Sequence, residues 1–152
     1  MLGMKKALSA YGQTSVEMAV DVASPHRLVM MLFDGAIKSV AMAKVHLEAG
    51  NIAEKGAATS KAIAIVDDGL RLSLDKEQGG ELASNLDALY EYISSQLLRA
   101  NLRNDAELFD EVLGLLGELK QSWEAIDPAV QAAQAVEPPR QDTASVLSYG
   151  RA

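Results

Sequence analysis

The sequence predicts an all-α protein, an antiparallel up-down four-helix bundle with a short N-terminal arm and a flexible C-terminal tail. Apolar residues recur at alternating steps of three and four along four stretches, each roughly 21 to 25 residues long, which is the spacing of helices that bury one face. Short runs of helix-ending residues separate these stretches, and helices joined by short turns pack as antiparallel neighbours. No stretch of useful length alternates as a β-strand does.

The 152 residues suffice for one domain with its own core. We expect an arm at 1–23, the bundle at 24–126 and a disordered tail at 127–152. The arm has a short amphipathic pattern that two glycines weaken, so it either pads the bundle or covers a binding groove. The tail has too few apolar residues to offset the entropy of ordering it. Within it, Val146, Leu147 and Tyr149 form a candidate docking motif.

The first predicted helix runs from Ser24 to Asn51. Ser24 is a favoured N-cap, Pro25 is favoured at the first helical position, and Gly50 is typical of a helix end. One seam of this helix consists of Val29, Phe33, Ala36, Val40, Ala43 and Leu47. Five further apolar residues fall outside that seam, namely Met30, Met31, Ile37, Met42 and Val45. This helix therefore carries more apolar surface than one seam buries.

The second predicted helix, from about Ile52 to Leu74, has two apolar seams. The first consists of Ile52, Gly56, Thr59, Ile63, Val66, Leu70 and Leu74, and the second of Ala58, Ala62, Ile65, Gly69 and Leu72. The sequence leaves open which seam faces the core. Because the second seam is rich in small residues, it favours a shallow groove where another backbone approaches closely.

The remaining helices are predicted at about 81–102 and 106–126. Gly79-Gly80 marks the turn before the first of them, and Asn104 or Asp105 is available as N-cap of the second. The main seams are Leu82, Leu86, Leu89, Ile93, Leu97 and Ala100 in one helix, and Leu108, Val112, Leu115, Leu119, Trp123 and Ile126 in the other. Asp127-Pro128 ends the last helix.

Composition narrows the functional classes. A net charge of −7 argues against nucleic acid or an anionic membrane as the main partner. The absence of cysteine excludes disulfides and thiolate metal sites. No secretory signal pattern and no run of about 18 apolar residues is present, so we expect a soluble cytoplasmic protein that does not insert into membranes.

The sequence contains no recognisable catalytic or metal-binding motif, and we expect no enzymatic activity, cofactor or metal. The two histidines, His26 and His46, lie near helix ends and lack the Glu-x-x-His pattern of metal-binding bundles, so we expect them to be solvent-exposed. Asp67 and Asp68 are adjacent and project about 100° apart on a helix, which does not suit a catalytic pair. The loop that begins at Asp75 lacks the acidic spacing of a calcium site.

The positive signal is the surplus of apolar surface on the first two helices. Methionine is adaptable and suits surfaces that accept a partner, but it also fills irregular cores. Pattern alone leaves these two explanations equal. A contiguous exposed apolar patch would decide for the partner.

Several ordered blocks resemble a known family. They are ALSAYGQTSVEMA at 7–19, ASPHRLVMMLFDGAI at 23–37, DDGLRLSLD at 67–75 and GGELASNLDALYEYISSQLLRAN at 79–101. Together with Trp123 they resemble the flagellin-specific export chaperones of bacteria, the FliS family, over about 7–126. This resemblance implies a cytoplasmic, non-enzymatic bundle that binds the disordered C-terminal segment of flagellin, prevents its premature polymerisation and presents it to the flagellar type III export gate.

The resemblance also implies that the tyrosine of the arm, Tyr11 here, covers apolar surface until flagellin displaces it, and we take Leu8 as its packing companion. For the groove itself we predict Ala62, Ile65, Leu72, Tyr90 and Leu98. On this assignment, Ile65→Asp is expected to abolish flagellin binding without unfolding the bundle. The alternative function is a regulatory adaptor that binds another flagellar protein through the same apolar groove.

Overall fold

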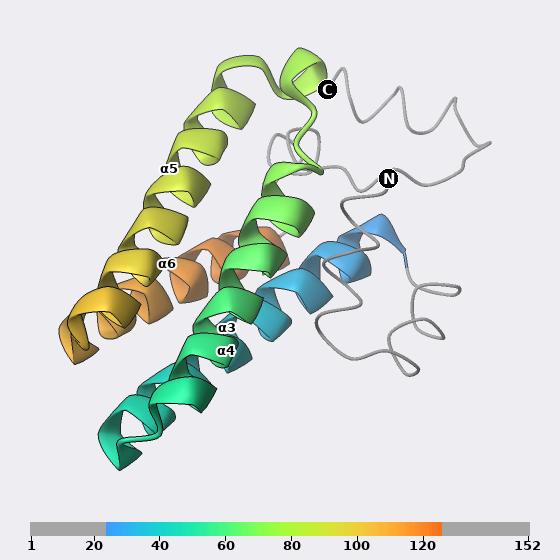
Figure 1. The fold of residues 1–152 in the computed structure, drawn as a ribbon. Helices are drawn as coiled ribbons and strands as arrows, with labels where there is room; N and C mark the ends of the chain where they lie inside the picture. Colours follow the sequence, from blue (N-terminus) through green and yellow to red (C-terminus); the bar gives the residue numbers. More distant parts are fainter. Residues whose placement is uncertain (1–23, 126–152) are drawn as a thin grey trace.

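The computed structural model describes residues 24–125, which form one bundle of helices (Figure 1). Helix α3 spans Pro25–Ala49 and α4 spans Ile52–Ala64, which a π-helical segment, η1 (Ile65–Arg71), continues. Helices α5 (Lys76–Arg103) and α6 (Ala106–Glu124) complete it. The all-α four-helix bundle is thereby confirmed, while the antiparallel order of its helices stays a prediction. The predicted arm, the predicted tail and Ile126 lie outside the described residues.

The four helices pack in a ring. Helix α3 contacts α4 and α6, and α5 contacts the same two helices from the opposite corner, while η1 packs against both α3 and α5. Each helix therefore shares one boundary with each of two neighbours. Two of these boundaries, α3–α6 and α4–α5, differ in ways that bear on function.

The helix ends follow the capping residues of the sequence. The Ser24 side chain accepts a hydrogen bond from the backbone N–H of Arg27 at 3.1 Å, and Gly50 ends α3 in the left-handed conformation at φ 78°. Asp75 and Asp105 cap α5 and α6 in the same way as Ser24 caps α3. Within α5, Gly80 breaks the helix at φ 52° and ψ −124°, a conformation that suits only glycine. The predicted turn before residue 81 is therefore one helical turn followed by this break.

The core is apolar and is shared by all four helices. Helix α3 buries the predicted seam from Val29 to Ala43, and it also buries a second stripe beside it, formed by Leu28, Leu32, Gly35 and Ser39. Of the surplus residues of this helix, Met30, Met31 and Ile37 pack partly against the core, whereas Met42 and Val45 stay exposed. The core explanation therefore holds for Met30, Met31 and Ile37, whereas the partner explanation stays a prediction.

The π-helical segment answers the question that the two seams of the second helix left open. Buried residues come from both seams: Thr59, Val66 and Leu70 from the first, and Ala62, Ile65 and Gly69 from the second. Because neighbouring residues such as Ile65 and Val66 are buried together, the face that η1 turns to the core is wider than one seam. Such wide turns are rare and recur at functional sites.

The α3–α6 boundary is closed by reciprocal contacts between the two helices. The ring of His26 stacks on that of Trp123, with centroids 5.1 Å apart and planes 14° from parallel. Trp123 Nε1 donates to the carbonyl of His26 at 3.0 Å, and the Nε2 of His26 lies 3.1 Å from the carbonyl oxygen of Trp123. The expectation that His26 is simply solvent-exposed is wrong, because the ring of Trp123 covers it.

Candidate functional site

The α4–α5 boundary is held by three polar ties at regular spacing along α5. Ser94 Oγ donates to Asp67 at 2.7 Å, and Asp87 lies one heptad earlier and accepts from Arg71 at 2.9 Å. One heptad later, the carbonyl of Asn101 accepts from the Lys55 ammonium at 2.9 Å. Positions seven residues apart lie on the same face of a helix. The line from Asp87 through Ser94 to Asn101 is therefore the edge of α5 that meets α4 and η1.

Two exposed leucines lie beside this line. Leu98 stands four residues after Ser94, and Leu102 stands four residues further on, so both flank the same edge. Their side chains are 52% and 71% exposed, respectively, which is high for leucine. We call this surface of α4 and α5 around Leu98 and Leu102 the α4–α5 face.

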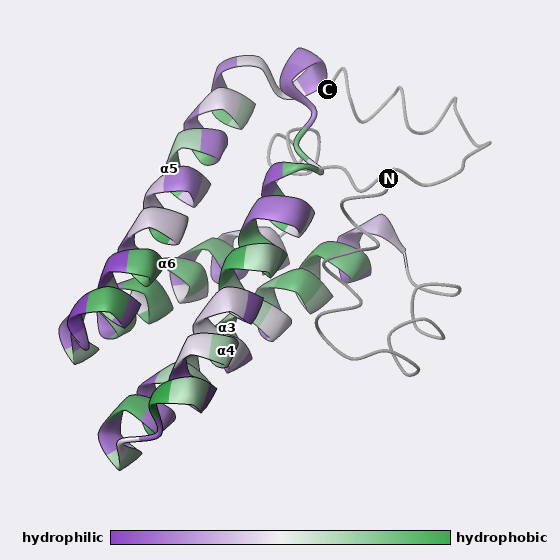
Figure 2. Ribbon diagram, viewed as in Figure 1, coloured by the Kyte–Doolittle hydropathy of each residue, from purple (hydrophilic) through white to green (hydrophobic). Residues whose placement is uncertain are grey.

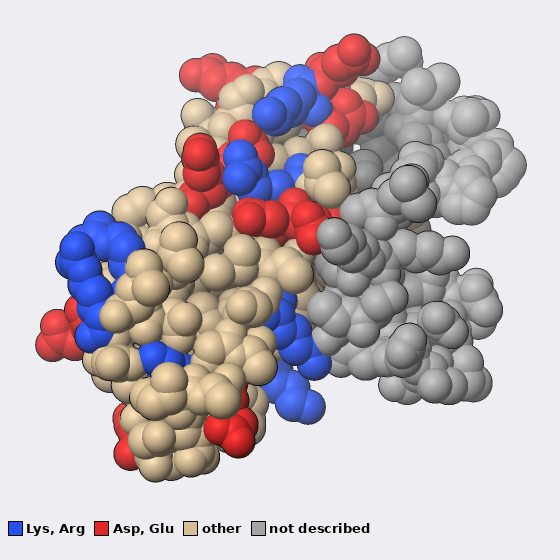
Figure 3. Space-filling view, in the orientation of Figure 1, with Lys and Arg blue, Asp and Glu red and all other residues tan. Residues whose placement is uncertain are grey.

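The α4–α5 face is largely free of charge. Figure 2 shows hydrophobic residues interspersed with hydrophilic ones at the lower ends of α4 and α5, while the upper half of α5 is more hydrophilic. In the same orientation, Figure 3 shows an expanse of uncharged side chains over the lower parts of both helices, bordered by charged side chains above it, along its left edge and below it. An exposed, uncharged surface of this kind favours contact with an apolar partner.

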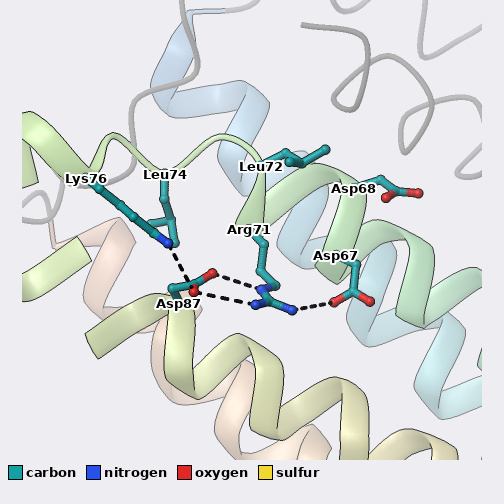
Figure 4. A pocket seen from close by; sticks show the side chains of 7 residues that line it. All are labelled: Asp67, Asp68, Arg71, Leu72, Leu74, Lys76 and Asp87. Carbon is teal, nitrogen blue, oxygen red and sulfur yellow. Dashed lines mark hydrogen bonds and ion pairs between the residues drawn. The ribbon is translucent and has the colours of Figure 1, made fainter. Parts of the chain in front are cut away.

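A charged pocket lies at the η1 end of the face. It has a volume of about 500 Å³ and is lined by Asp67, Asp68, Arg71, Leu72, Leu74, Lys76 and Asp87 (Figure 4). The guanidinium of Arg71 lies between Asp87 at 2.9 Å and Asp67 at 3.7 Å, and Lys76 Nζ reaches Asp87 at 3.3 Å. The hydrogen bond from Arg71 holds the pKa of Asp87 below its usual range, with a smaller contribution from Lys76.

The opposite end of the face is fixed by a buried lysine. Lys55 is buried in the first turn of α4, and its ammonium donates to the carbonyl of Asn101 and to the side-chain oxygen of Asn104. Asn104 ends α5 in the left-handed conformation at φ 52°. A cation at the C-terminal end of a helix satisfies its free carbonyls and complements its dipole. Lys55 thus ties the start of α4 to the turn between α5 and α6.

The structure separates the predicted groove residues into two groups. Leu72 and Leu98 are exposed, at 62% and 52% respectively. Ala62, Ile65 and Tyr90 are fully buried, and burial raises the pKa of the Tyr90 hydroxyl. A partner does not reach these three side chains in this conformation, so Ile65→Asp places a charge in the core, contrary to the expectation that it spares folding. Their role in partner binding stays a prediction. Leu8 and Tyr11 lie outside the described residues.

Leu102 and Lys55 were not predicted from the sequence, although the helical spacing of their neighbours indicates the position of each. Leu102 follows Leu98 by four residues and so continues its stripe. Lys55 precedes Thr59, Ala62 and Val66 at steps of four, three and four, which places a lysine on a buried seam. A lysine in such a position within the first turn of a helix requires acceptors from a neighbouring element, and here the end of α5 supplies them.

The described residues contain neither a metal-binding cluster nor a membrane-spanning helix. Between residues 24 and 125, no group of three or more His, Cys, Asp or Glu side chains is placed to hold a metal ion. Over the same range, no helix combines the length and the apolar character that crossing a membrane requires. The described part of the chain is thus a small all-α bundle with an uncharged face between a charged pocket and a buried lysine.

Comparison with known proteins defines the class further. The family model described as "Flagellar protein FliS" matches residues 7–130. A flagellar secretion chaperone FliS from Salmonella typhimurium is 52% identical over 121 residues, which cover 80% of this chain and 90% of that relative. FliSB from Pseudomonas aeruginosa, also named a flagellar secretion chaperone, is 48% identical over 121 residues, with 80% and 95% covered. The corresponding Vibrio cholerae chaperone is 38% identical over 134 residues, with 88% and 98% covered.

The chain therefore belongs to the FliS family, as the sequence motifs predicted. The relatives named above are chaperones of flagellar secretion, so the class is that of a chaperone. The matched residues include all four described helices, and they end at residue 130. Residues 131–152 lie beyond the family match.

Proposed function

We propose that this protein is a cytoplasmic export chaperone that binds the disordered C-terminal segment of flagellin, prevents its premature polymerisation and delivers it to the flagellar type III export gate. Membership of the FliS family supports the chaperone role. The observation that supports the binding mode is the uncharged α4–α5 face with its exposed leucines. A client helix lies along such a surface with apolar anchors at i, i+3 or i+4, and i+7.

The energetics require a contact longer than Leu98 and Leu102 alone. Full burial of a leucine contributes about 1.5–3 kcal/mol, so these two half-exposed side chains together supply about 3 kcal/mol. Ordering a disordered client costs about 2–5 kcal/mol or more, which consumes that gain. We therefore expect flagellin to extend beyond the two leucines, toward Leu72 at the η1 end of the face, where 62% of the side chain is exposed.

The buried residues of the predicted groove have a supporting place in this proposal. Ala62 and Ile65 shape the backbone of α4 and η1 beneath the face, and Tyr90 does so on α5. Leu8 and Tyr11 are proposed to occupy apolar surface before flagellin arrives. Deletion of residues 1–16 tests this role, since removal of a competing segment is expected to tighten flagellin binding in a calorimetric titration.

The decisive experiment compares two equally exposed aliphatic positions on different helices. Leu98 and Val45 are each 52% exposed, on α5 and α3 respectively. Leu98→Asp is expected to weaken binding of a flagellin C-terminal peptide at least about tenfold, which is about 1.4 kcal/mol. Val45→Asp introduces the same charge at the same exposure and is expected to change the affinity by less than about twofold. Isothermal titration calorimetry measures both, and equal effects would contradict the proposed face.

A second experiment separates flagellin from other flagellar clients. Affinity capture from flagellated cells with wild-type protein and with Leu98→Asp is expected to retain flagellin only in the wild-type sample. If another flagellar protein is retained and flagellin is absent, the regulatory adaptor replaces the export chaperone. Capture of the cytoplasmic part of an export-gate protein by the chaperone–flagellin complex tests the delivery step.

A further inference from the structure

We propose that the α4–α5 face has a second occupant, the segment 143–150 of this chain, which competes with the client for the face. The inference rests on three observations: the exposed apolar character of the face, the composition of the segment, and the length of chain that joins the two. The competition rests on the proposed function, whereas the docking of the segment does not.

The face offers apolar contact without charge. Leu98 and Leu102 are the exposed anchors on α5, and Figure 3 shows an expanse of uncharged side chains over the lower parts of α4 and α5, with charged side chains at its borders. Within residues 24–125, the α4–α5 boundary is tied by hydrogen bonds at its inner line, which leaves these two leucines outside the ties. A segment that docks here needs apolar side chains and no charge.

Segment 143–150 has that composition. Its sequence is TASVLSYG, with Val146, Leu147 and Tyr149 as apolar members and no Asp, Glu, Lys or Arg. Charged residues stand directly outside it, Asp142 before and Arg151 after. The segment also lies beyond residue 130, where the family match ends, so the family's shared part does not account for it.

The chain between α6 and the segment is long enough to reach the face. Gln96 Nε2 donates to Glu111 at 2.9 Å, which places the level of Leu98 near that of Glu111 on α6. Glu111 stands 13 residues before the end of α6 at Glu124, which is about 20 Å along a helix. The 21 residues from Ala125 to Ser145 span about 25 Å as a typical coil and about 70 Å when extended. The linker therefore covers the distance without being stretched.

A tethered segment competes even when its own affinity is weak. A linker of this kind holds the segment at an effective concentration on the order of millimolar, so a millimolar contact is occupied about half of the time. The apparent affinity of the client then falls in proportion to the fraction of free face. Removal of the apolar side chains of the segment is expected to tighten client binding about two- to tenfold.

Disulfide trapping tests the docking directly, because the chain contains no cysteine of its own. The test pair is Ser148→Cys with Ser95→Cys, since Ser95 is exposed on α5 three residues before Leu98. The control pair is Ser148→Cys with Gly114→Cys, since Gly114 is exposed on α6 and has space for a Cβ. Gly114 lies closer to the start of the tail than Glu111 does, so a tail that contacts surfaces at random links to Gly114 at least as fast.

Each outcome decides between occupants. An intramolecular disulfide that forms at least about fivefold faster for the Ser95 pair than for the Gly114 pair supports the docked segment. Equal rates overturn it. A disulfide-linked dimer means that a second copy covers the face and also overturns it. A third pair, Ser9→Cys with Ser95→Cys, reports the arm, and faster trapping of this pair than of the Ser148 pair assigns the face to the arm instead.

Calorimetry on the full chain then tests the competition. The variant V146S/L147S/Y149S is compared with V130S/V136S, which removes two apolar side chains from the same tail outside the segment. The triple variant is expected to bind a flagellin C-terminal peptide two- to tenfold more tightly, and the control variant with unchanged affinity. Unchanged affinity in both overturns the competition. If the peptide binds no form of the protein, the proposed function fails, while the trapping result still decides whether the segment docks.

Discussion

The α3–α6 side and the α4–α5 side of the bundle are joined by contacts of different kinds. Across α3 and α6, Lys44 pairs with Asp110 and Lys120 pairs with Asp34, each at 2.7 Å, and the stacked His26–Trp123 rings close the end. Across α4 and α5, polar ties run along the inner line, and apolar leucines remain exposed outside them. Long charged side chains bridge both boundaries, through Lys44 and Lys120 on one side and through Arg71 on the other, but none of the described bridges covers Leu98 or Leu102.

This difference separates stability from binding. The contacts across the α3–α6 side are ion pairs and stacked rings, so these side chains act mainly on folding. The ties across the α4–α5 side leave Leu98 and Leu102 uncovered, so this side stays closed and still presents apolar side chains. We therefore expect substitutions at the inner ties and at the α3–α6 contacts to change stability, and substitutions at Leu98 and Leu102 to change partner binding.

The largest expected effect is that of Ile65→Asp, which breaks the inner part of the α4–α5 side. Ile65 is fully buried in η1, so the variant loses an apolar contact and places an unpaired carboxylate in the core. The free energy of unfolding is expected to fall by at least about 4 kcal/mol. Urea unfolding followed by circular dichroism measures it. The control is Leu98→Asp, with a change within about 0.5 kcal/mol because the site is exposed. Equal losses of stability in Ile65→Asp and Leu98→Asp would contradict the division into a buried, stabilising part and an exposed, partner-binding part.

The second prediction concerns the buried lysine at the end of the face. Lys55→Met keeps most of the apolar stem and removes the ammonium, which leaves the carbonyl of Asn101 without its donor. A loss of about 1–3 kcal/mol in the free energy of unfolding is expected, since a buried acceptor loses its partner. Lys61→Met is the matched control, because Lys61 is only half-buried on the same helix. If both variants lose the same stability, the tie to α5 is not the cause.

The third prediction addresses the α3–α6 side. Trp123→Phe removes the hydrogen bond to the His26 carbonyl and part of the stacked area, and is expected to cost about 1–2 kcal/mol. Binding of a flagellin peptide is expected to stay within about twofold of wild type, because the contact lies outside the α4–α5 face. Tyr92→Phe is the control, since it removes an exposed hydrogen bond to Glu111. A marked loss of peptide binding by Trp123→Phe would contradict the separation of the two sides.

The helices and most of the core could be predicted from periodicity and capping residues. Ser24, Gly50 and Asp105 fix helix ends through their own side chains or backbone, so local sequence suffices to locate them. The seam of α3 from Val29 to Ala43 was also predictable, because a helix in a bundle buries residues at steps of three and four. The family could be inferred from the motif blocks, and the family match confirms it.

The exposure of individual site residues could not be predicted in the same way. The two seams of the second helix were visible, but the π-helical turn that buries Ile65 beside Val66 depends on packing against α3 and α5. Tyr90 lies outside the predicted main seam of its helix, and yet it is buried because the core is wider than a single seam. Leu98 and Leu72 are exposed because the helices beside them leave them uncovered, which is a tertiary property.

The smallest expected effect is on the charged pocket at the η1 end of the face. The guanidinium of Arg71 holds the pKa of Asp87 below its usual range, so the carboxylate favours the folded state. Such a group stabilises the protein at pH values above its unfolded pKa of about 3.9, and this contribution is lost as the pH falls through the lower folded value. Asp87→Asn is therefore expected to lower the free energy of unfolding by at most about 1 kcal/mol at pH 7, since exposed ion pairs contribute little. Urea unfolding at pH 7 and at the lowest pH that keeps the protein folded compares the wild type with Asp87→Asn, and the difference in the free energy of unfolding should shrink on acidification.

Asp110→Asn, at a more exposed pair with Lys44, is expected to show a smaller difference at pH 7. A difference for Asp87→Asn that stays constant as the pH falls would instead assign its effect to packing against Arg71 and Leu74 and not to charge.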